Sequence, residues 1–174
     1  MRMPTLYQFF RHQVGHEFAT HGLTEPATVD YVSEVLARFA QVQALYGVTD
    51  TEGRPLEYVV DFLAAAREEE GRRPDRARGR SIWRHLGEYT LFMSGLFRER
   101  LKTRGELHYY QAQGANAYWQ CADYEPQPSR QVLFRRLHQN FTRITDSLDE
   151  MRRTRFPLRS EASAENIVMA LWRV

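Results

Sequence analysis

Apolar residues recur along this 174-residue chain at the three- and four-residue spacing of an α-helix, and no alternating strand pattern competes with it. The pattern predicts helices over residues 5–21, from Thr24 or Thr28 to Tyr46, and over residues 55–70, 81–103, 106–124, 129–155 and 163–174. Gly22, Gly105 and the segment EPQPS at 125–129 supply breaks between them. The sequence therefore predicts an all-α fold, a single-domain irregular bundle of about six or seven helices that spans residues 1–174.

The predicted helix over residues 129–155 carries a narrow apolar seam, with steps of three and four residues throughout. The seam consists of Leu133, Leu137, Phe141, Ile144, Leu148 and Met151. One continuous helix with one buried stripe is the expected arrangement.

The most unusual stretch is RHLGEYTLFMSGLF, residues 84–97, because a histidine, a glutamate and two glycines interrupt an apolar helical run. On a helical wheel, His85 falls inside the apolar arc and Glu88 at its boundary, so the two can form an i, i+3 pair. A histidine held by a carboxylate can serve as a general base or as an oriented metal ligand. The same pair can simply satisfy a buried imidazole, and the lack of a nucleophile at a diagnostic spacing favours this structural role.

The two glycines of that stretch, Gly87 and Gly95, lie near each other on the opposite side of the wheel. Each costs a helix about 1 kcal/mol relative to alanine. We therefore expect a close contact there, with a neighbouring helix rather than with a ligand.

The predicted helix over residues 106–124 has two unlike faces. A core-facing stripe consists of Leu107, Tyr110, Gly114, Tyr118 and Cys121. The opposite row consists of Tyr109, Gln113, Asn116 and Gln120. Neutral hydrogen-bonding groups in a row favour a protein interface or a ligand over bulk water, although a solvated face remains the alternative.

No metal or cofactor is predicted from the motifs. His16, Glu17 and His21 resemble the zinc-protease pattern HExxH, but the histidines are five residues apart instead of four, which excludes that class. His12 and His16 have the spacing of a metal-binding pair but lack a carboxylate in register. No ExxH motif of a di-iron bundle, glycine-rich phosphate loop or GxSxG elbow is present.

The two halves of the chain carry net charges of opposite sign. Residues 1–70 carry 5 basic and 11 acidic side chains, and residues 71–174 carry 19 and 11, with an arginine-rich loop predicted from Gly71 to Arg80. Acidic residues interrupt the basic ones, which argues against nucleic-acid binding. No segment is apolar enough to cross a membrane, and the single cysteine, Cys121, favours a reducing compartment, so a cytoplasmic location is expected.

The segments RHLGEYTLFMSGLF and YYQAQGANAY, residues 109–118, resemble a group of small uncharacterised bacterial all-helical proteins. The shared positions are His85, Gly87, Glu88, Tyr89, Leu91 and Phe92, then Tyr110, Gly114 and Tyr118. The resemblance implies an all-helical fold and draws attention to these two segments. It implies no activity.

Two hypotheses of function follow. The first is a non-enzymatic interaction or regulatory protein that binds itself or another protein through its aromatic-rich termini and the neutral polar row of Tyr109, Gln113, Asn116 and Gln120. The second is a helical domain that binds a small molecule or a metal, or is catalytic, with a pocket formed by His85, Glu88, Tyr110 and Tyr118. Exposure of His85 and Tyr110 to a cavity would distinguish the second from the first.

Overall fold

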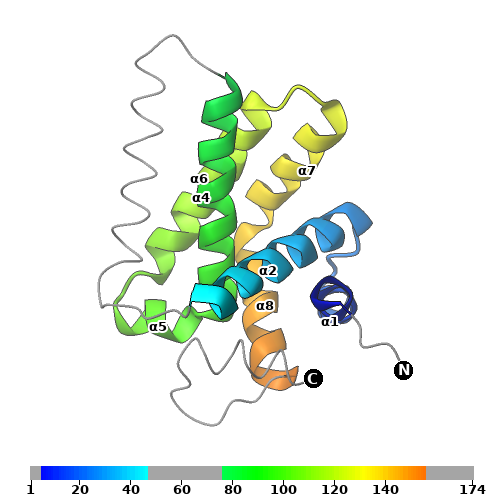
Figure 1. Ribbon diagram of the computed structural model, residues 1–174, viewed down its shortest axis with the longest axis vertical. Coiled ribbons are helices and arrows are strands. Elements are labelled where there is room, and N and C mark those ends of the chain that lie inside the picture. Colours follow the sequence, from blue (N-terminus) through cyan, green and yellow to red (C-terminus); the bar gives the residue numbers. More distant parts are fainter. Residues whose placement is uncertain (1–4, 47–75, 156–174) are drawn as a thin grey trace.

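The computed structural model describes residues 5–46 and 76–155, and these form an all-α bundle (Figure 1). The helices are α1 (Leu6–Thr20), α2 (Pro26–Tyr46), α4 (Arg76–Leu96), α5 (Arg98–Thr103), α6 (Leu107–Tyr124), α7 (Pro128–Gln139) and α8 (Phe141–Arg155). The described residues contain no strand, so the predicted fold class is confirmed. The helices predicted over residues 55–70 and 163–174 lie outside the described residues.

Local sequence explains most helix ends. Thr5 caps α1 in a capping box with Gln8, and the positive φ of Gly22 (72°) ends that helix. Gly105, with a φ of 69°, ends α5 in the same way. Helix α2 begins with Pro26 at its first position, so the N-cap position falls on Glu25 and on neither of the two predicted caps, Thr24 and Thr28.

The predicted helix over residues 81–103 is divided at Phe97 into α4 and α5. The buried Arg98 side chain donates to the Ser94 carbonyl at 3.1 Å, the acceptor that a continuous helix offers to a backbone N–H. Its guanidinium then reaches Asp146 on α8 at 2.7 Å. This contact between distant segments was not visible in the periodicity.

Helix α4 also begins earlier than expected, at Arg76, inside the predicted arginine-rich loop. Arg76 donates to the Asp123 carbonyl at 3.2 Å and lies over the ring of Tyr124. The buried Gly79 packs against the same ring. Contacts with the end of α6 therefore extend the helix by one turn.

A second break divides the predicted helix over residues 129–155. The Asn140 side chain donates to the Arg136 carbonyl at 3.0 Å, and the Asn140 backbone N–H donates to the same carbonyl at 2.9 Å; α7 ends at this residue. All six residues of the predicted seam are nevertheless buried. The seam is correct, but it belongs to two helices.

Helix α4 is the centre of the described bundle, in contact with α2, α6 and α8 (Figure 1). All its residues from Leu91 to Leu96 are buried, and so are Phe97 and Arg98. The expected close approach at its glycines is confirmed: a Cβ on Gly87 would lie 2.9 Å from the ring of Tyr118, and one on Gly95 would lie 2.8 Å from Leu148. Helices α6 and α8 thus approach α4 more closely than side chains at these positions would permit.

Candidate functional site

A buried carboxylate lies where α2, α4 and α6 meet. Glu88 on α4 is 1% exposed and accepts a hydrogen bond from the Tyr31 hydroxyl at 3.0 Å. Arg38 on α2 donates to both carboxylate oxygens, at 2.8 and 3.3 Å. The hydroxyl of Tyr118 on α6 lies 3.2 Å from that of Tyr31. We name Tyr31, Arg38, Glu88 and Tyr118 the Glu88 cluster.

The pairing predicted for Glu88 is corrected by this geometry. His85 was expected inside the apolar arc, held by Glu88, but His85 is exposed and Glu88 is buried. The carboxylate instead takes its partners from α2, together with Arg84, whose Nε lies 3.6 Å from it. The error arose because a helical wheel ranks positions within one helix, whereas the buried side of α4 is decided by the helices around it.

The pKa values of Arg38, Tyr31 and Tyr118 in the Glu88 cluster are all raised. Partial burial lowers the pKa of Arg38, but the hydrogen bond and charge of Glu88 outweigh it, so the pKa is raised and the guanidinium stays charged. Burial, supported by the charge of Glu88, raises the pKa of both Tyr31 and Tyr118 well above the usual value. General acid–base catalysis requires a pKa near the working pH, and these phenols are far from it.

Two further buried residues, Cys121 and Tyr110, also have raised pKa values. Burial and the charge of Glu88 raise the pKa of the Cys121 thiol, so Cys121 is not an activated nucleophile. Burial and the neighbouring Tyr89 raise the pKa of Tyr110. Tyr110 also precedes Tyr118 by two helical turns, about 12 Å along α6, so the structure does not bring it into the Glu88 cluster.

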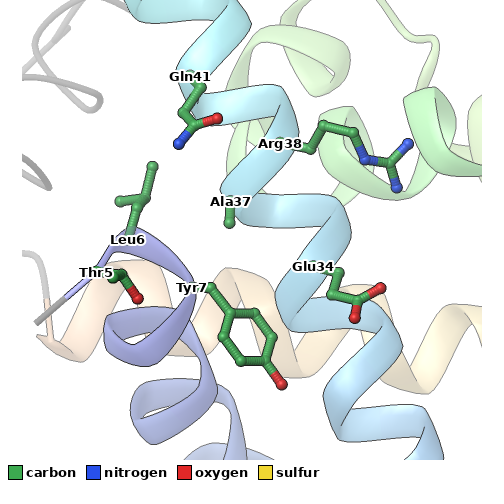
Figure 2. A pocket seen from close by; sticks show the side chains of 7 residues that line it. All are labelled: Thr5, Leu6, Tyr7, Glu34, Ala37, Arg38 and Gln41. Carbon is green, nitrogen blue, oxygen red and sulfur yellow. The ribbon is translucent and has the colours of Figure 1, made fainter.

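Each of two hollows is lined in part by one of the arginines that reach Glu88. The first, of about 400 Å³, lies between the start of α1 and α2 and is lined by Thr5, Leu6, Tyr7, Glu34, Ala37, Arg38 and Gln41. Figure 2 shows Arg38 extending from α2 away from Leu6 and Tyr7. The second, of about 390 Å³, is lined by Arg80, Arg84, Glu125, Pro126, Gln127 and Arg130. Glu88 lines neither of these two hollows. Among the described residues, the Glu88 cluster is a packed polar contact between α2, α4 and α6.

The predicted polar row lies on α6 and is accessible to solvent; we name Tyr109, Gln113, Asn116 and Gln120 the α6 polar face. Asn116 is exposed, and Tyr109, Gln113 and Gln120 are half-buried. The residue that sequence reasoning missed here is Trp119, which is 52% exposed and adjoins Asn116 and Gln120 on the helix. Its ring packs on His138 of α7, with ring centroids 5.1 Å apart, and His138 Nδ1 donates to the Ala115 carbonyl at 2.7 Å. A large aromatic side chain is therefore held in place at the surface.

One group of side chains in the described parts of the chain has the composition of a metal site. Glu17 and His21 of the α1 end face Glu150 of α8, with candidate ligand atoms within 4.8 Å of one another. In the sequence, Glu17 and His21 stood out only as part of the rejected HExxH pattern. Their own i, i+4 spacing was a usable signal, but nothing in the sequence pointed to Glu150.

Comparison with known proteins adds no identity: no protein family, curated protein or solved structure matches this chain. Within the described residues, no helix has both the length and the apolar character that a membrane span requires.

Proposed function

We propose that this chain is a non-enzymatic helical interaction protein that associates with a second copy of itself through the α6 polar face and Trp119. The observation that carries the proposal is Trp119, which is 52% exposed, adjoins Asn116 and Gln120 on α6 and packs on His138 of α7. Tryptophan is the residue most enriched among those that dominate binding energy, and a fixed ring loses little conformational entropy on association.

The charge pattern of α6 supports a second copy as the partner. From Leu107 to Ala122 the helix has no Lys, Arg, Asp or Glu. In a two-fold symmetric interface the same patch meets itself, so any charged residue near the axis would face a like charge. This uncharged stretch avoids that repulsion, and the exposed Asp123 lies just beyond its end. A strongly charged partner would find no complementary charge within the stretch.

The Glu88 cluster supports a non-enzymatic role for the described bundle. Its carboxylate is paired with an arginine, and the phenols and thiol around it have pKa values far from neutrality. We also propose that the protein works in the cytoplasm, since its single cysteine is buried and forms no disulfide.

Sedimentation velocity over a range of concentrations tests the proposal. The parent should show a reversible dimer. Trp119→Ala should weaken it by about 2 kcal/mol, or roughly thirtyfold in Kd, as expected for a central aromatic anchor. The double variant Gln113→Arg with Asn116→Arg should be a monomer with unchanged helical circular dichroism, because each copy would place two positive charges against two others.

A matched control adds the same charge elsewhere. Thr142→Arg with Thr154→Arg changes two exposed positions on α8 and should leave the dimer intact. A parent that stays monomeric at all concentrations would refute self-association. Equal dimerisation by the α6 double variant would show that another surface is used.

A further inference from the structure

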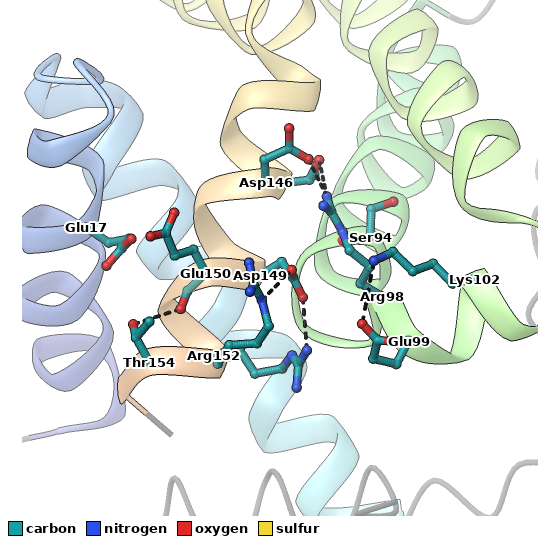
Figure 3. A network of polar contacts seen from close by, with 12 residues as sticks. Glu17, Ser94, Arg98, Glu99, Lys102, Asp146, Asp149, Glu150, Arg152 and Thr154 are labelled. Carbon is teal, nitrogen blue, oxygen red and sulfur yellow. Dashed lines mark hydrogen bonds and ion pairs between the residues drawn. The ribbon is translucent and has the colours of Figure 1, made fainter. Parts of the chain in front are cut away.

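The end of α1 and the middle of α8 bring one imidazole and two carboxylates together. His21 Nε2 lies 3.2 Å from Glu17 Oε1 and 3.0 Å from Glu150 Oε2. Figure 3 shows Glu17 on α1 and Glu150 on α8 facing each other across the gap between these helices. Glu17 and His21 belong to one segment, and Glu150 lies at least 129 residues further along the chain, yet the fold brings the three potential ligands together.

The fold positions each ligand differently. Glu17 is only 5% exposed, and its second oxygen, Oε2, lies 3.4 Å from Arg155 Nε, so Oε1 is the oxygen that faces His21. Arg155 is itself held by Gln13, whose Oε1 accepts from Arg155 Nη1 at 3.2 Å. His21 follows the last residue of α1, where the turn at Gly22 closes with Leu23 N–H donating to the Phe18 carbonyl at 2.8 Å. A carboxylate fixed from behind by an arginine is the kind of outer support found around metal ligands.

We propose that Glu17, His21 and Glu150 form a binding site for a divalent transition-metal ion, with Zn²⁺ as the best fit. One imidazole and two carboxylates are a donor set that zinc accepts, whereas calcium and magnesium prefer sites made only of oxygen. Metal–ligand bonds of about 2.0–2.2 Å at tetrahedral angles place neighbouring ligand atoms roughly 3.3–3.6 Å apart. The separations of His21 Nε2 from the two carboxylates, 3.2 and 3.0 Å, are close to this, and the two carboxylate oxygens lie within 4.8 Å of each other. Water would complete the coordination, and Arg155 would balance part of the charge of the two carboxylates.

A second possible zinc site on α1 has to be distinguished experimentally from the site of Glu17, His21 and Glu150. His12 and His16 are both exposed on α1, one turn apart, with ring centroids 4.9 Å from each other. An exposed histidine pair of this spacing can capture zinc without any built site. The two candidates share no residue, so substitution distinguishes them.

Isothermal titration of the full chain, first stripped with a chelator, with Zn²⁺ as the probe decides the proposal. We expect one Zn²⁺ per chain in the parent and in His12→Asn with His16→Asn. Glu150→Gln should bind at least about tenfold more weakly. Glu150 is suited to this test because it is half-exposed and its replacement leaves the buried Glu17 in place.

A second measurement records the thermal stability of the protein instead of the heat of binding. Zn²⁺ joins α1 to α8 only in the folded state, so it should raise the Tm of the parent and of the His12/His16 variant but not that of Glu150→Gln. Mg²⁺ should raise none of them. Absence of zinc binding by the parent would overturn the proposal, and so would binding that survives in Glu150→Gln but is lost in the His12/His16 variant. Neither result depends on whether α6 mediates association.

Discussion

Replacement of Gly114 by alanine should destabilise the protein, although alanine is the better helix former. In a helix interior this change alone gains about 1 kcal/mol. Here, however, an added Cβ would lie 2.2 Å from Phe141 Cζ and 2.5 Å from Thr90 Oγ1. Both neighbours are buried, and the Thr90 hydroxyl is already bonded to the carbonyls of Leu86 and Gly87 at 2.8 and 3.0 Å.

Neither neighbour of Gly114 can move aside without disturbing the packing between α4, α6 and α8. We therefore take the upper part of the usual overpacking range, about 3 kcal/mol, which leaves a net loss of about 2 kcal/mol after the gain in helix propensity. Urea denaturation followed by circular dichroism measures this directly, with an unchanged m value as the sign that both end states are preserved.

Gly15→Ala is the matched control, since Gly15 also lies in the interior of a helix. An added Cβ there would meet Arg11 Nη1 at 3.1 Å, the end of a flexible side chain, and Val29 Cγ1 at 3.9 Å. Gly15→Ala should therefore be neutral or stabilise by up to about 1 kcal/mol. If Gly114→Ala were as stable as the parent, the close approach of α6 to Phe141 and Thr90 would be wrong.

Two further predictions concern the Glu88 cluster and its surroundings. Because each unit of raised pKa lowers the thiolate fraction about tenfold, Cys121 should react with a thiol reagent more than about a hundredfold more slowly in the folded protein than in urea; equal rates would show an accessible thiol. The raised pKa of Tyr118 means that the folded state holds its proton more tightly than the unfolded state, so stability is present below about pH 10 and falls above it. Tyr118→Phe should cost about 1 kcal/mol at neutral pH but show a smaller loss in alkali, and denaturation at a series of pH values would contradict this if the two proteins lost stability in parallel.

Helix type and most helix limits follow from local signals, which is why the sequence predicts them. Gly22 and Gly105 end helices because their positive φ is accessible mainly to glycine. The break at Phe97 could not be predicted in the same way, because it depends on Arg98 turning inward to meet Asp146, 48 residues further along the chain. Asn140 was a local signal that the strong seam of residues 133–151 concealed.

The candidate site likewise contains residues that the sequence indicated and residues that it could not indicate. Glu88 stood out in the sequence because a carboxylate interrupted an apolar helical run, and Tyr118 because a large phenol lay on the predicted core-facing stripe. Their partners could not be inferred, since Tyr31 and Arg38 lie 57 and 50 residues before Glu88 and no periodicity links α2 to α4. Trp119 was overlooked because its position on the wheel says nothing about how far α7 covers it.

The unusual composition of α4 has an explanation within the described core. Gly87 leaves the room that the Tyr118 ring fills, and that ring carries its hydroxyl to Tyr31, which donates to Glu88. A glycine and a glutamate side by side in an apolar helix thus serve a single contact between α4, α6 and α2. Once this contact accounts for Gly87 and Glu88, they no longer require a ligand. The α6 polar face has no comparable role in the core, because Asn116 and Trp119 point outward, and this asymmetry is the reason to seek the function of the protein on α6.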